Sequence, residues 1–330
     1  MRVVVTGGAG YIGAHVVRSL RAAGRDVLVV DDLSTGRAER VRDVPLLRLD
    51  LADPAGVPVL AAAMREHGVD AVVHLAGKKR VEESFARPEW YEAQNVGSLR
   101  VVLAAMAAQG VDRLVFSSSA AVYGEPGVTH VTEDVEPRPI NPYGETKLAG
   151  ERLIAATPGL RHVSLRYFNV IGAGSRELGD PTVLNLLTIV LDLLEQGRRP
   201  RVFGSDYPTP DGTCVRDFVH VEDLAEAHLA ALDHLEREER PVDVLNVGTG
   251  RGHSVLEVLD AVRRASGCEV VPEFVGRRPG DPAEMVARVD RIAEVLGWRA
   301  RLGLEEAVTS AWEAWRHDRE RGLPVVRASD

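Results

Sequence analysis

The chain has 330 residues with a formal net charge of -9, and 45% of its residues are hydrophobic. This composition predicts a globular protein with ample core, built as one large domain or two moderate ones. The acidic balance argues against nucleic acid as a partner, because binding to a phosphate backbone needs a basic face. No apolar run approaches the roughly 18 residues of a membrane span, and Thr6-Gly7-Gly8 interrupts the first apolar run, so we expect neither a membrane segment nor a signal peptide. Cys214 and Cys268 have no metal-binding spacing, so we expect no metal and a cytoplasmic location.

The chain begins with a short apolar run, Arg2 to Val5, which predicts a strand. A glycine-rich turn follows, and the segment from Ala14 to Ala23 has helical spacing. Such glycines permit a tight turn and let a pyrophosphate approach the backbone at the start of the helix. The turn fits two spacings of the dinucleotide-binding pattern, through Gly7 or Gly8 together with Gly10 and Gly13.

A second predicted strand, Asp26 to Val30, ends at Asp31. Dinucleotide-binding proteins place the acid that binds the adenosine ribose at this point. A carboxylate there would repel a 2′-phosphate, which favours NAD over NADP. Asp31 or Asp32 alone could be an ordinary residue of a turn at a strand end, but strand, glycines, helix, strand and Asp together predict dinucleotide binding.

The same alternation of strands and helices continues and predicts a doubly wound parallel sheet. In such sheets the ligand lies beyond the C-terminal strand ends, so Gly10, Gly77 and Ser119 should meet in one crevice. The further strands are expected at Leu46–Leu49, Ala71–Leu75, Arg113–Phe116 and His162–Tyr167, and the helices at Pro54–His67 and Trp90–Gln109.

Tyr143 and Lys147 are four residues apart at the predicted start of a helix, just after Pro142. Residues at this spacing share one helix face, so a nearby ammonium could favour the phenolate and lower the pKa of Tyr143. Such a tyrosine could accept a proton from a sugar hydroxyl. The pair could be a coincidence on a surface helix, but the chain has only three lysines among its 40 basic residues, which suggests that Lys147 is needed as an ammonium.

The pattern becomes irregular after Tyr167. Loops are expected at Gly172–Gly174 and Gly204–Gly212, and the tail from Arg321 to Asp330 is expected to fray. The remaining elements are expected as helices over Pro181–Gln196, Val221–Leu235, Ser254–Ala265 and Leu304–Trp315, and as a strand over Val242–Val247.

Six segments together resemble the extended short-chain dehydrogenase/reductases, that is, the NAD-dependent epimerase/dehydratase family, and within it the epimerases of UDP-glucose and UDP-galactose. The Asp206–Thr213 run is the most specific of the six. They are Thr6–Gly13, His74–Gly77, Phe116–Gly124, Tyr143–Lys147, Leu165–Asn169 and Asp206–Thr213, the last leading to Val215–Asp217. The resemblance implies a Rossmann-like NAD-binding domain (1–168 plus about 213–250) and a smaller mixed α/β nucleotide-sugar domain (169–212 plus about 251–330).

The resemblance also implies the roles of individual residues. Tyr143 would be the catalytic base, Lys147 would lower its pKa and hold the nicotinamide ribose, and Ser119 would bond the reacting hydroxyl. The cofactor site would comprise Gly7, Gly10, Tyr11, Ile12, Gly13, Asp31, Asp32, Leu33, Asp50, Leu51, Leu75, Ala76, Gly77, Lys79, Asn95, Tyr143, Lys147 and Tyr167. The substrate site would comprise Lys79, Ser119, Tyr143, Asn169, Leu184, Arg201, Phe203, Arg216, Arg278, Asp281 and Met285.

Other interpretations stay open for several of these residues. Ser119 could simply end a strand, His74 is better read as a packed strand residue than as a base, and Arg216 and Arg278 could form surface ion pairs. The Phe203 and Tyr207 rings could belong to the core. The chain departs from the family pattern at Lys78, Ala121, Val170 and Val183, and the flexible Met285 leaves open whether N-acetyl sugars fit.

The implied activity is an NAD-dependent C4 epimerisation of a UDP-hexose through a 4-keto intermediate, and the implied assembly is a homodimer formed by the Trp90–Gln109 and Tyr143 helices. A 4-epimerase acting on UDP-N-acetylhexosamine, UDP-glucuronate or UDP-xylose is the nearest alternative. A dehydratase fits less well because Ser119-Ala120-Ala121-Val122 lacks the expected acid and base. A non-catalytic NAD sensor would typically have lost Tyr143 or Lys147.

Overall fold

A large parallel sheet forms the first half of the fold. The structure is a computed structural model and describes residues 1–238, 242–278 and 280–327. The sheet order is β3-β2-β1-β4-β5-β7-β12, with every pairing parallel, as the doubly wound prediction requires. Its strands are β1 (Arg2–Thr6), β2 (Asp26–Asp31), β3 (Leu46–Arg48), β4 (Ala71–His74), β5 (Arg113–Ser119), β7 (Arg161–Tyr167) and β12 (Val242–Val247).

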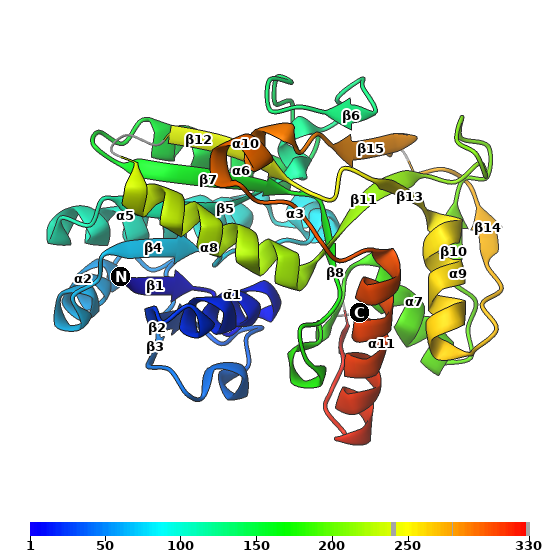
Figure 1. The fold of residues 1–330 in the computed structure, drawn as a ribbon, viewed down its shortest axis with the longest axis horizontal. Helices are drawn as coiled ribbons and strands as arrows, with labels where there is room; N and C mark the ends of the chain where they lie inside the picture. Colours follow the sequence, from blue (N-terminus) through cyan, green and yellow to red (C-terminus); the bar gives the residue numbers. More distant parts are fainter. Residues whose placement is uncertain (239–241, 279, 328–330) are drawn as a thin grey trace.

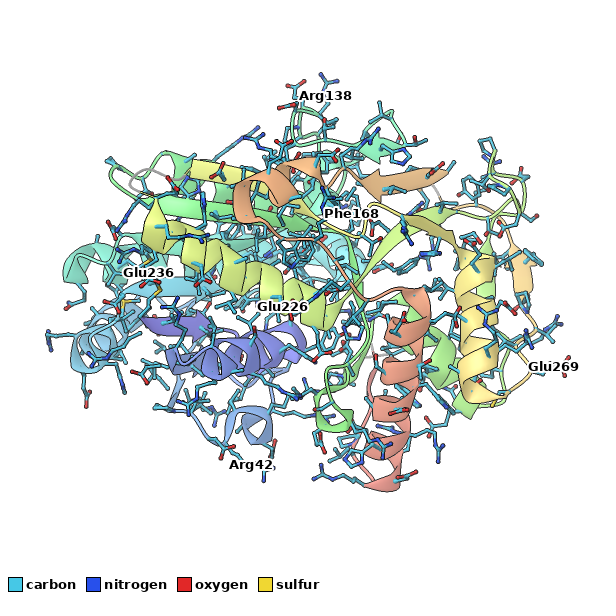
Figure 2. The ribbon with its side chains drawn as sticks, viewed as in Figure 1. Arg42, Arg138, Phe168, Glu226, Glu236 and Glu269 are labelled. Atoms are coloured by element: carbon cyan, nitrogen blue, oxygen red, sulfur yellow. The ribbon has the colours of Figure 1, made fainter. Side chains whose placement is uncertain are left out.

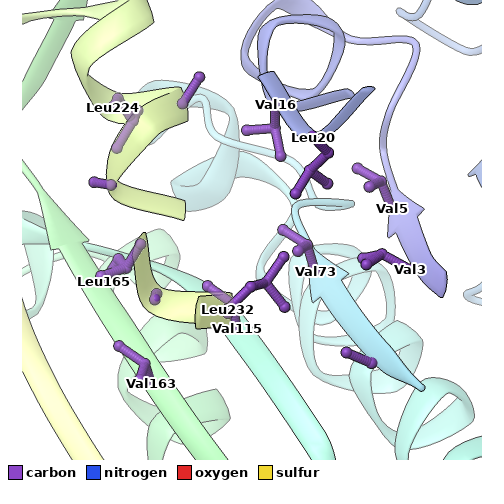
Figure 3. Packing of buried hydrophobic residues seen from close by; sticks show 14 of the residues in the cluster. Val3, Val5, Val16, Leu20, Val73, Val115, Val163, Leu165, Leu224 and Leu232 are labelled. Carbon is purple, nitrogen blue, oxygen red and sulfur yellow. The ribbon is translucent and has the colours of Figure 1, made fainter. Parts of the chain in front are cut away.

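Helices cover both faces of this sheet (Figure 1). One face carries α1 (Tyr11–Ala22), α8 (Val221–Arg237) and α10 (Asp290–Leu296), and the other carries α2 (Gly56–His67), α5 (Ser98–Gln109) and α6 (Pro142–Ala155). Successive strand residues point to opposite faces, so Val3 and Val5 pack on α1 and α8, whereas Val4 packs on the other side. Figure 3 shows the first of these cores, where Leu20 of α1 and Leu232 of α8 approach the strands.

A smaller C-terminal unit follows the large sheet. Its central strand β11 (Val215–His220) pairs with β8 (Asn169–Ile171), β13 (Gly252–Ser254) and β15 (Glu284–Ala287), and β15 also pairs with β6 (His130–Val131). Two further pairs are β10 (Arg201–Phe203) with β14 (Glu273–Val275) and β9 (Thr182–Val183) with β16 (Val326–Arg327). The helices of the unit are α7 (Leu186–Glu195), α9 (Val255–Ser266) and α11 (Leu304–Glu320).

Many charged side chains lie at the periphery of the molecule, whereas the two units meet through an apolar cluster. In Figure 2, Arg42, Arg138 and Glu269 lie at the outer edge, and Phe168, which is 7% exposed, lies inside. Phe168 directly follows β7 and belongs to a core cluster that also includes Val131 of β6 and Ala287 of β15. The two units therefore share a small core beside the ends of the large sheet.

The long helix predicted over Trp90–Gln109 is helical throughout, as α4 (Pro88–Glu92), a π-helical turn (Ala93–Gly97) and α5. Two other sequence predictions of secondary structure were wrong. The Pro181–Gln196 helix begins only at Leu186, because Asn185 caps it and the residues before the cap form β9. The tail does not simply fray, since Val326 and Arg327 form β16, while 328–330 lie outside the described residues.

The remaining short segments connect these elements. They are α3 (Val81–Ala86) and the 3₁₀ turns at Ala38–Val41, Ala120–Tyr123 and Arg176–Leu178. Among the described residues, no helix is long and apolar enough to cross a membrane.

Candidate functional site

A cavity of about 450 Å³ lies beyond the C-terminal ends of the central strands, where doubly wound sheets bind their ligands. This volume is within the range of small-molecule sites. The predicted cofactor residues that line it are Gly7, Gly10, Tyr11, Ile12, Gly13, Asp31, Asp32, Asp50, Leu51, Leu75, Ala76, Gly77, Lys79, Tyr143, Lys147 and Tyr167. Leu33 and Asn95 stand directly behind the lining, and of the predicted substrate residues Leu184, Lys79 and Tyr143 take part in it.

The glycine turn between β1 and α1 leaves no room for a side chain at Gly7 or Gly13. A Cβ on Gly13 would lie 2.1 Å from the carbonyl oxygen of Gly7, and Gly7 itself has a φ of 68°. Gly10 precedes α1 and cannot cap it with a side chain, so the first helical amides face the cavity end of the helix. This cradle fits a pyrophosphate, which helix N-termini bind through backbone N–H groups.

Asp31 is held in a fixed position at the end of β2. Its carboxylate accepts hydrogen bonds from the backbone N–H groups of Ala9 and Leu33, both at 2.9 Å. Leu33 is the only non-glycine residue with a positive φ, 60°, in the part of the chain that the structure describes. Burial raises the pKa of Asp31, although these two backbone bonds counteract it. The resulting acceptor is oriented as a ribose hydroxyl would require.

The two lysines after Gly77 contact lining residues from two different segments of the chain. The Lys78 ammonium lies 2.8 Å from Ser34 Oγ, whereas that of Lys79 lies 3.8 Å from Asp180 Oδ2. Asn95, in the π-helical turn, fixes the backbone between them, because its Oδ1 accepts from Lys78 N at 2.7 Å and its Nδ2 donates to Lys78 O at 3.0 Å. The irregular turn in the long helix thus points a buried amide at the site.

Tyr143 and Lys147 are brought together on α6, whose first turn is capped by Asn141. Both side chains are buried, and Lys147 Nζ lies 6.0 Å from the Tyr143 ring centroid while donating to Ser117 O at 2.8 Å. Ser119 forms a hydrogen bond with the Tyr143 side chain and also accepts from Ala121 N at 3.1 Å. The two hydroxyls and the ammonium therefore gather beside the cavity.

The pKa of Tyr143 is raised here, contrary to the sequence expectation. Burial is the dominant cause, and the hydrogen bond with Ser119 lowers the pKa only in part. Burial also lowers the pKa of Lys147 to about 8, with Glu151 acting in the opposite direction. The i,i+4 spacing correctly predicted that the two groups lie close together. It could not predict that desolvation of the Tyr143 phenol would raise its pKa more than nearby groups lower it.

A buried charge network lies beneath these groups. Arg166 donates to both carboxylate oxygens of Glu151, at 2.9 and 2.6 Å, and to the Tyr123 hydroxyl at 3.0 Å. Ser118 also donates to Glu151. Each partner is next to a residue of the site: Glu151 is one helical turn after Lys147, and Ser118 immediately precedes Ser119. His74 is a packed residue, as expected, with Nδ1 2.8 Å from Thr6 Oγ1 and a pKa lowered to about 3 by burial.

The other predicted substrate residues lie in the C-terminal unit, outside this lining. Arg216 of β11 donates to Asp281, and Met285 is the register partner of Arg216 on β15. The Arg278 guanidinium stacks 3.8 Å from the Phe203 ring centroid. The last two of the set are Asn169, which donates to Asp217 O at 3.1 Å, and Arg201, which lies 3.5 Å from Glu273.

Some lining residues were not predicted. Asp180, Pro181 and Thr182 precede α7, and Val326 and Arg327 belong to the C-terminal strand. Pro181 and Thr182 lie in a segment that the sequence indicated as helix, Asp180 immediately precedes it, and Val326 and Arg327 lie in the tail that was expected to fray. Of the lining residues that were not predicted, only Lys78 could have been recognised from the sequence, because it departs from the family pattern beside Lys79.

The sheet order, the glycine cradle and the buried Tyr143–Lys147 pair define a dinucleotide-binding protein of the Rossmann type with an oxidoreductase-like site. Residues 3–248 match the model of the "NAD dependent epimerase/dehydratase family". The chain belongs to this family, which confirms the resemblance drawn from the sequence.

Full-length relatives agree with this assignment. The chain is 44% identical to UDP-glucose 4-epimerase of Azospirillum brasilense, over 98% of this chain and 94% of the relative, and 43% identical to the Streptomyces lividans enzyme of that name, over 97% and 98%. Among solved structures, the UDP-glucose 4-epimerase of Stenotrophomonas maltophila with bound NAD and formylated UDP-arabinopyranose is 38% identical, with a TM-score of 0.92 over 98% of this chain and all of the other. The Bifidobacterium longum enzyme in complex with NAD⁺ and UDP is 36% identical, with a TM-score of 0.87 over 98% and 100%.

Proposed function

We propose that the protein is an NAD-dependent 4-epimerase that interconverts UDP-glucose and UDP-galactose. The observation that carries this proposal is that Tyr143 and Lys147 both line a dinucleotide cavity, while Ser119, which is outside the lining, forms a hydrogen bond with the Tyr143 side chain. The names of the full-length relatives support the same reaction, and several of the similar solved structures contain NAD.

In this reaction the side chains of the chain move a proton and hold the sugar. Tyr143 takes the proton of the 4-hydroxyl, with Ser119 bonded to the same oxygen, as C4 becomes a ketone. NAD, when held by the cavity, would supply a reversible hydride acceptor for C4. The 4-keto sugar then turns about its diphosphate linkage, and Tyr143 returns the proton when the hydrogen comes back on the opposite face.

The nucleotide half of the substrate is assigned to the C-terminal unit. Arg216 and Arg278 supply guanidinium groups for the diphosphate, because such planar forks match phosphate oxygens. Asp281, which pairs with Arg216, is proposed to meet the uridine ribose. Anchoring the diphosphate away from the reacting carbon keeps the keto intermediate bound while the sugar stays free to turn.

The same division extends to the domains. We assign residues 1–168 plus about 213–250 to the cofactor and 169–212 plus about 251–330 to the nucleotide sugar. β11 pairs with strands of the C-terminal unit, whereas α8 and β12 lie on the large sheet, so the segment from 213 to 250 links the two parts.

A homodimer formed through α5 and the Tyr143 helix α6 is part of the proposal. Exposed alanines on α5, namely Ala104, Ala107 and Ala108, give a small-residue surface on which a second helix can pack closely. Sedimentation of the purified protein tests this, and an Ala104→Arg variant should sediment as a monomer. A monomeric wild-type protein would contradict this assembly.

We also propose a cytoplasmic location and a role in galactose metabolism. The support for the location is that Cys214 and Cys268 are both free thiols, as is usual in a reducing compartment. Cell fractionation and growth of a deletion strain on galactose test these two assignments separately.

The activity is tested by incubating the purified protein with NAD and UDP-galactose and measuring UDP-glucose in a coupled assay. Tyr143→Phe should lower kcat by about 10² to 10⁴, the usual contribution of a general acid–base group. Tyr91→Phe removes a hydroxyl that is not itself in the lining, although it bonds Arg80 N and Glu83, and should cost far less activity than Tyr143→Phe. Lack of interconversion by the wild-type protein would refute the proposed reaction, and an unaffected Tyr143→Phe variant would refute the assigned base.

A further inference from the structure

The far end of the chain forms part of the cavity wall. Val326 and Arg327 make the strand β16, which pairs in parallel with Thr182 and Val183 of β9, and Val326 N donates to Pro181 O at 2.9 Å. Both residues of β16 line the cavity, together with Pro181 and Thr182. In Figure 1 the chain that follows α11 runs back alongside that helix, and its pairing with β9 brings β16 to the site.

One anchor ties β16 to helix α7. The guanidinium of Arg327 contacts the Asp192 carboxylate through Nη2 at 2.7 Å and Nε at 3.2 Å. Asp192 is only 5% exposed and does not line the cavity, and Gln196 also donates to it at 2.7 Å. A bidentate, charge-assisted contact to a buried carboxylate fixes the strand firmly.

A second anchor ties Pro324, two residues before β16, to the segment that follows β2. Arg37 donates from Nη2 to Pro324 O at 3.0 Å, and its backbone N–H donates to Ala9 O at 3.0 Å. Arg37 closely follows Ser34 and Thr35, which line the cavity. The tail therefore bridges the turn after β2 and the segment before α7, across the cavity.

Two residues of strand are too few to persist without side-chain support, which Arg327 and Arg37 provide. Val326 is 40% exposed although it is apolar, so a ligand in the cavity would cover surface that water now contacts. We infer that the C-terminal strand β16 is part of the dinucleotide-binding site and slows release of the bound cofactor. This inference rests on the proposed use of NAD, and it assigns the tail a role in ligand retention.

The test compares two shortened chains that both carry a new terminal carboxylate. One ends after Val325 and lacks β16, and the other ends after Arg327 and keeps it. Each chain is loaded with labelled NAD and mixed with an excess of unlabelled NAD. The rate at which the labelled NAD is released is then measured. The chain without β16 should release NAD at least about tenfold faster, because differences in affinity between related complexes lie mostly in the dissociation rate. The chain ending after Arg327 should match the wild-type protein.

Point variants separate anchoring from general loss of structure. Arg327→Gln and Asp192→Asn should each speed NAD release, and the double variant should be no faster than the single ones, because both break one contact. Arg316→Gln serves as the matched control, because it removes a guanidinium that pairs with Glu320 on the surface of α11. This variant should leave the rate of NAD release unchanged.

Release of NAD at the wild-type rate from the chain lacking β16 would overturn the inference while leaving the proposed function intact. If circular dichroism shows that this chain does not fold, the Arg327→Gln and Asp192→Asn variants provide the test. Release of NAD from both variants at the wild-type rate would then overturn the inference. If the wild-type protein itself binds no NAD, the cofactor assignment fails first and the role of β16 falls with it.

Discussion

Replacing Glu151 with Gln should show how much the site depends on the charge network beneath it. Glu151 and its partner Arg166 have side chains that are only 7% and 6% exposed, and the carboxylate accepts from Arg166 twice and from Ser118 once. Glu151→Gln keeps the size of the side chain but removes its charge. The Arg166 guanidinium would then remain buried opposite a neutral amide, which also carries donors where acceptors are needed.

The expected loss follows from the cost of an uncompensated buried charge. Removing one partner of a buried pair costs about 3–5 kcal/mol. For a chain of 330 residues the entropy of unfolding is about 0.7 kcal/mol per kelvin, so Tm should fall by about 4–7 °C. The direction of the effect on the pKa of Lys147 can also be predicted. Burial lowers this pKa, and the negative charge of Glu151 partly offsets that lowering. Without this carboxylate, the pKa of Lys147 should fall further below its present value of about 8.

The assay is thermal unfolding combined with the pH dependence of kcat. Glu151→Gln should shift the alkaline limb of the pH profile to lower pH, which a loss of stability alone would not do. Glu145→Gln makes the same chemical change on an exposed position of the same helix and should alter neither Tm nor the profile. A Glu151→Gln protein with wild-type Tm and an unshifted pH profile would refute this account of the network.

Three further perturbations address the cradle, the nucleotide site and acid stability. Gly13→Ala would place a methyl group 2.1 Å from Gly7 O, so NAD titration should detect no binding, and near-normal affinity would contradict the cradle. Arg216→Lys loses the planar fork, so UDP affinity by calorimetry should fall about tenfold while NAD affinity is kept; an equal loss of both would argue against the separate nucleotide site. Burial lowers the pKa of His228 to about 4. Between pH 6.5 and 4 the unfolded chain therefore binds more protons at His228 than the folded protein does. The free energy of unfolding should decrease as the pH is lowered through this range, by up to about 1.4 kcal/mol per pH unit. His228→Gln should lessen this slope in denaturant titrations at pH 7 and pH 5, and an unchanged slope would exclude His228 as its source.

The large sheet was predictable because its strands are buried on both faces. Runs such as Val3–Val5 and Val27–Val30 need no alternation when helices cover both sides, so each run stands out against the helical spacing around it. The first glycine turn was also readable, because only glycine fits where a Cβ would meet the backbone. The fold class predicted from these local signals is confirmed.

The C-terminal unit was much harder to predict. β11 contains Arg216 and the fully buried Asp217, whose carboxylate accepts from Thr249 N at 2.8 Å and Gly250 N at 2.9 Å. These partners lie more than thirty residues away, and no local pattern reveals them. Short strands that depend on such long-range contacts give no periodic signal of their own.

The site residues also divide into those that a local motif predicts and those that only long-range contacts bring to the site. Asp31 and Gly13 lie in recognisable motifs, whereas the wall formed by Asp180 and Val326 arises from a pairing between distant segments. The raised pKa of Tyr143 likewise depends on its burial in the folded chain, which spacing along a helix cannot reveal.

The position of β12 at the edge of the large sheet has a consequence for synthesis on the ribosome. Its neighbour β7 ends at Tyr167, but β12 begins only at Val242, after the elements from β8 to α8 have been made. Until then β7 is an edge strand with unpaired backbone groups, and unpaired edges favour association between chains. The nascent chain must therefore protect one open edge for the time needed to translate some seventy residues, which takes about 4–15 s at common elongation rates. Slow elongation through this stretch, or loss of chaperone cover during it, should reduce the yield of folded protein more than the same delay after Val247.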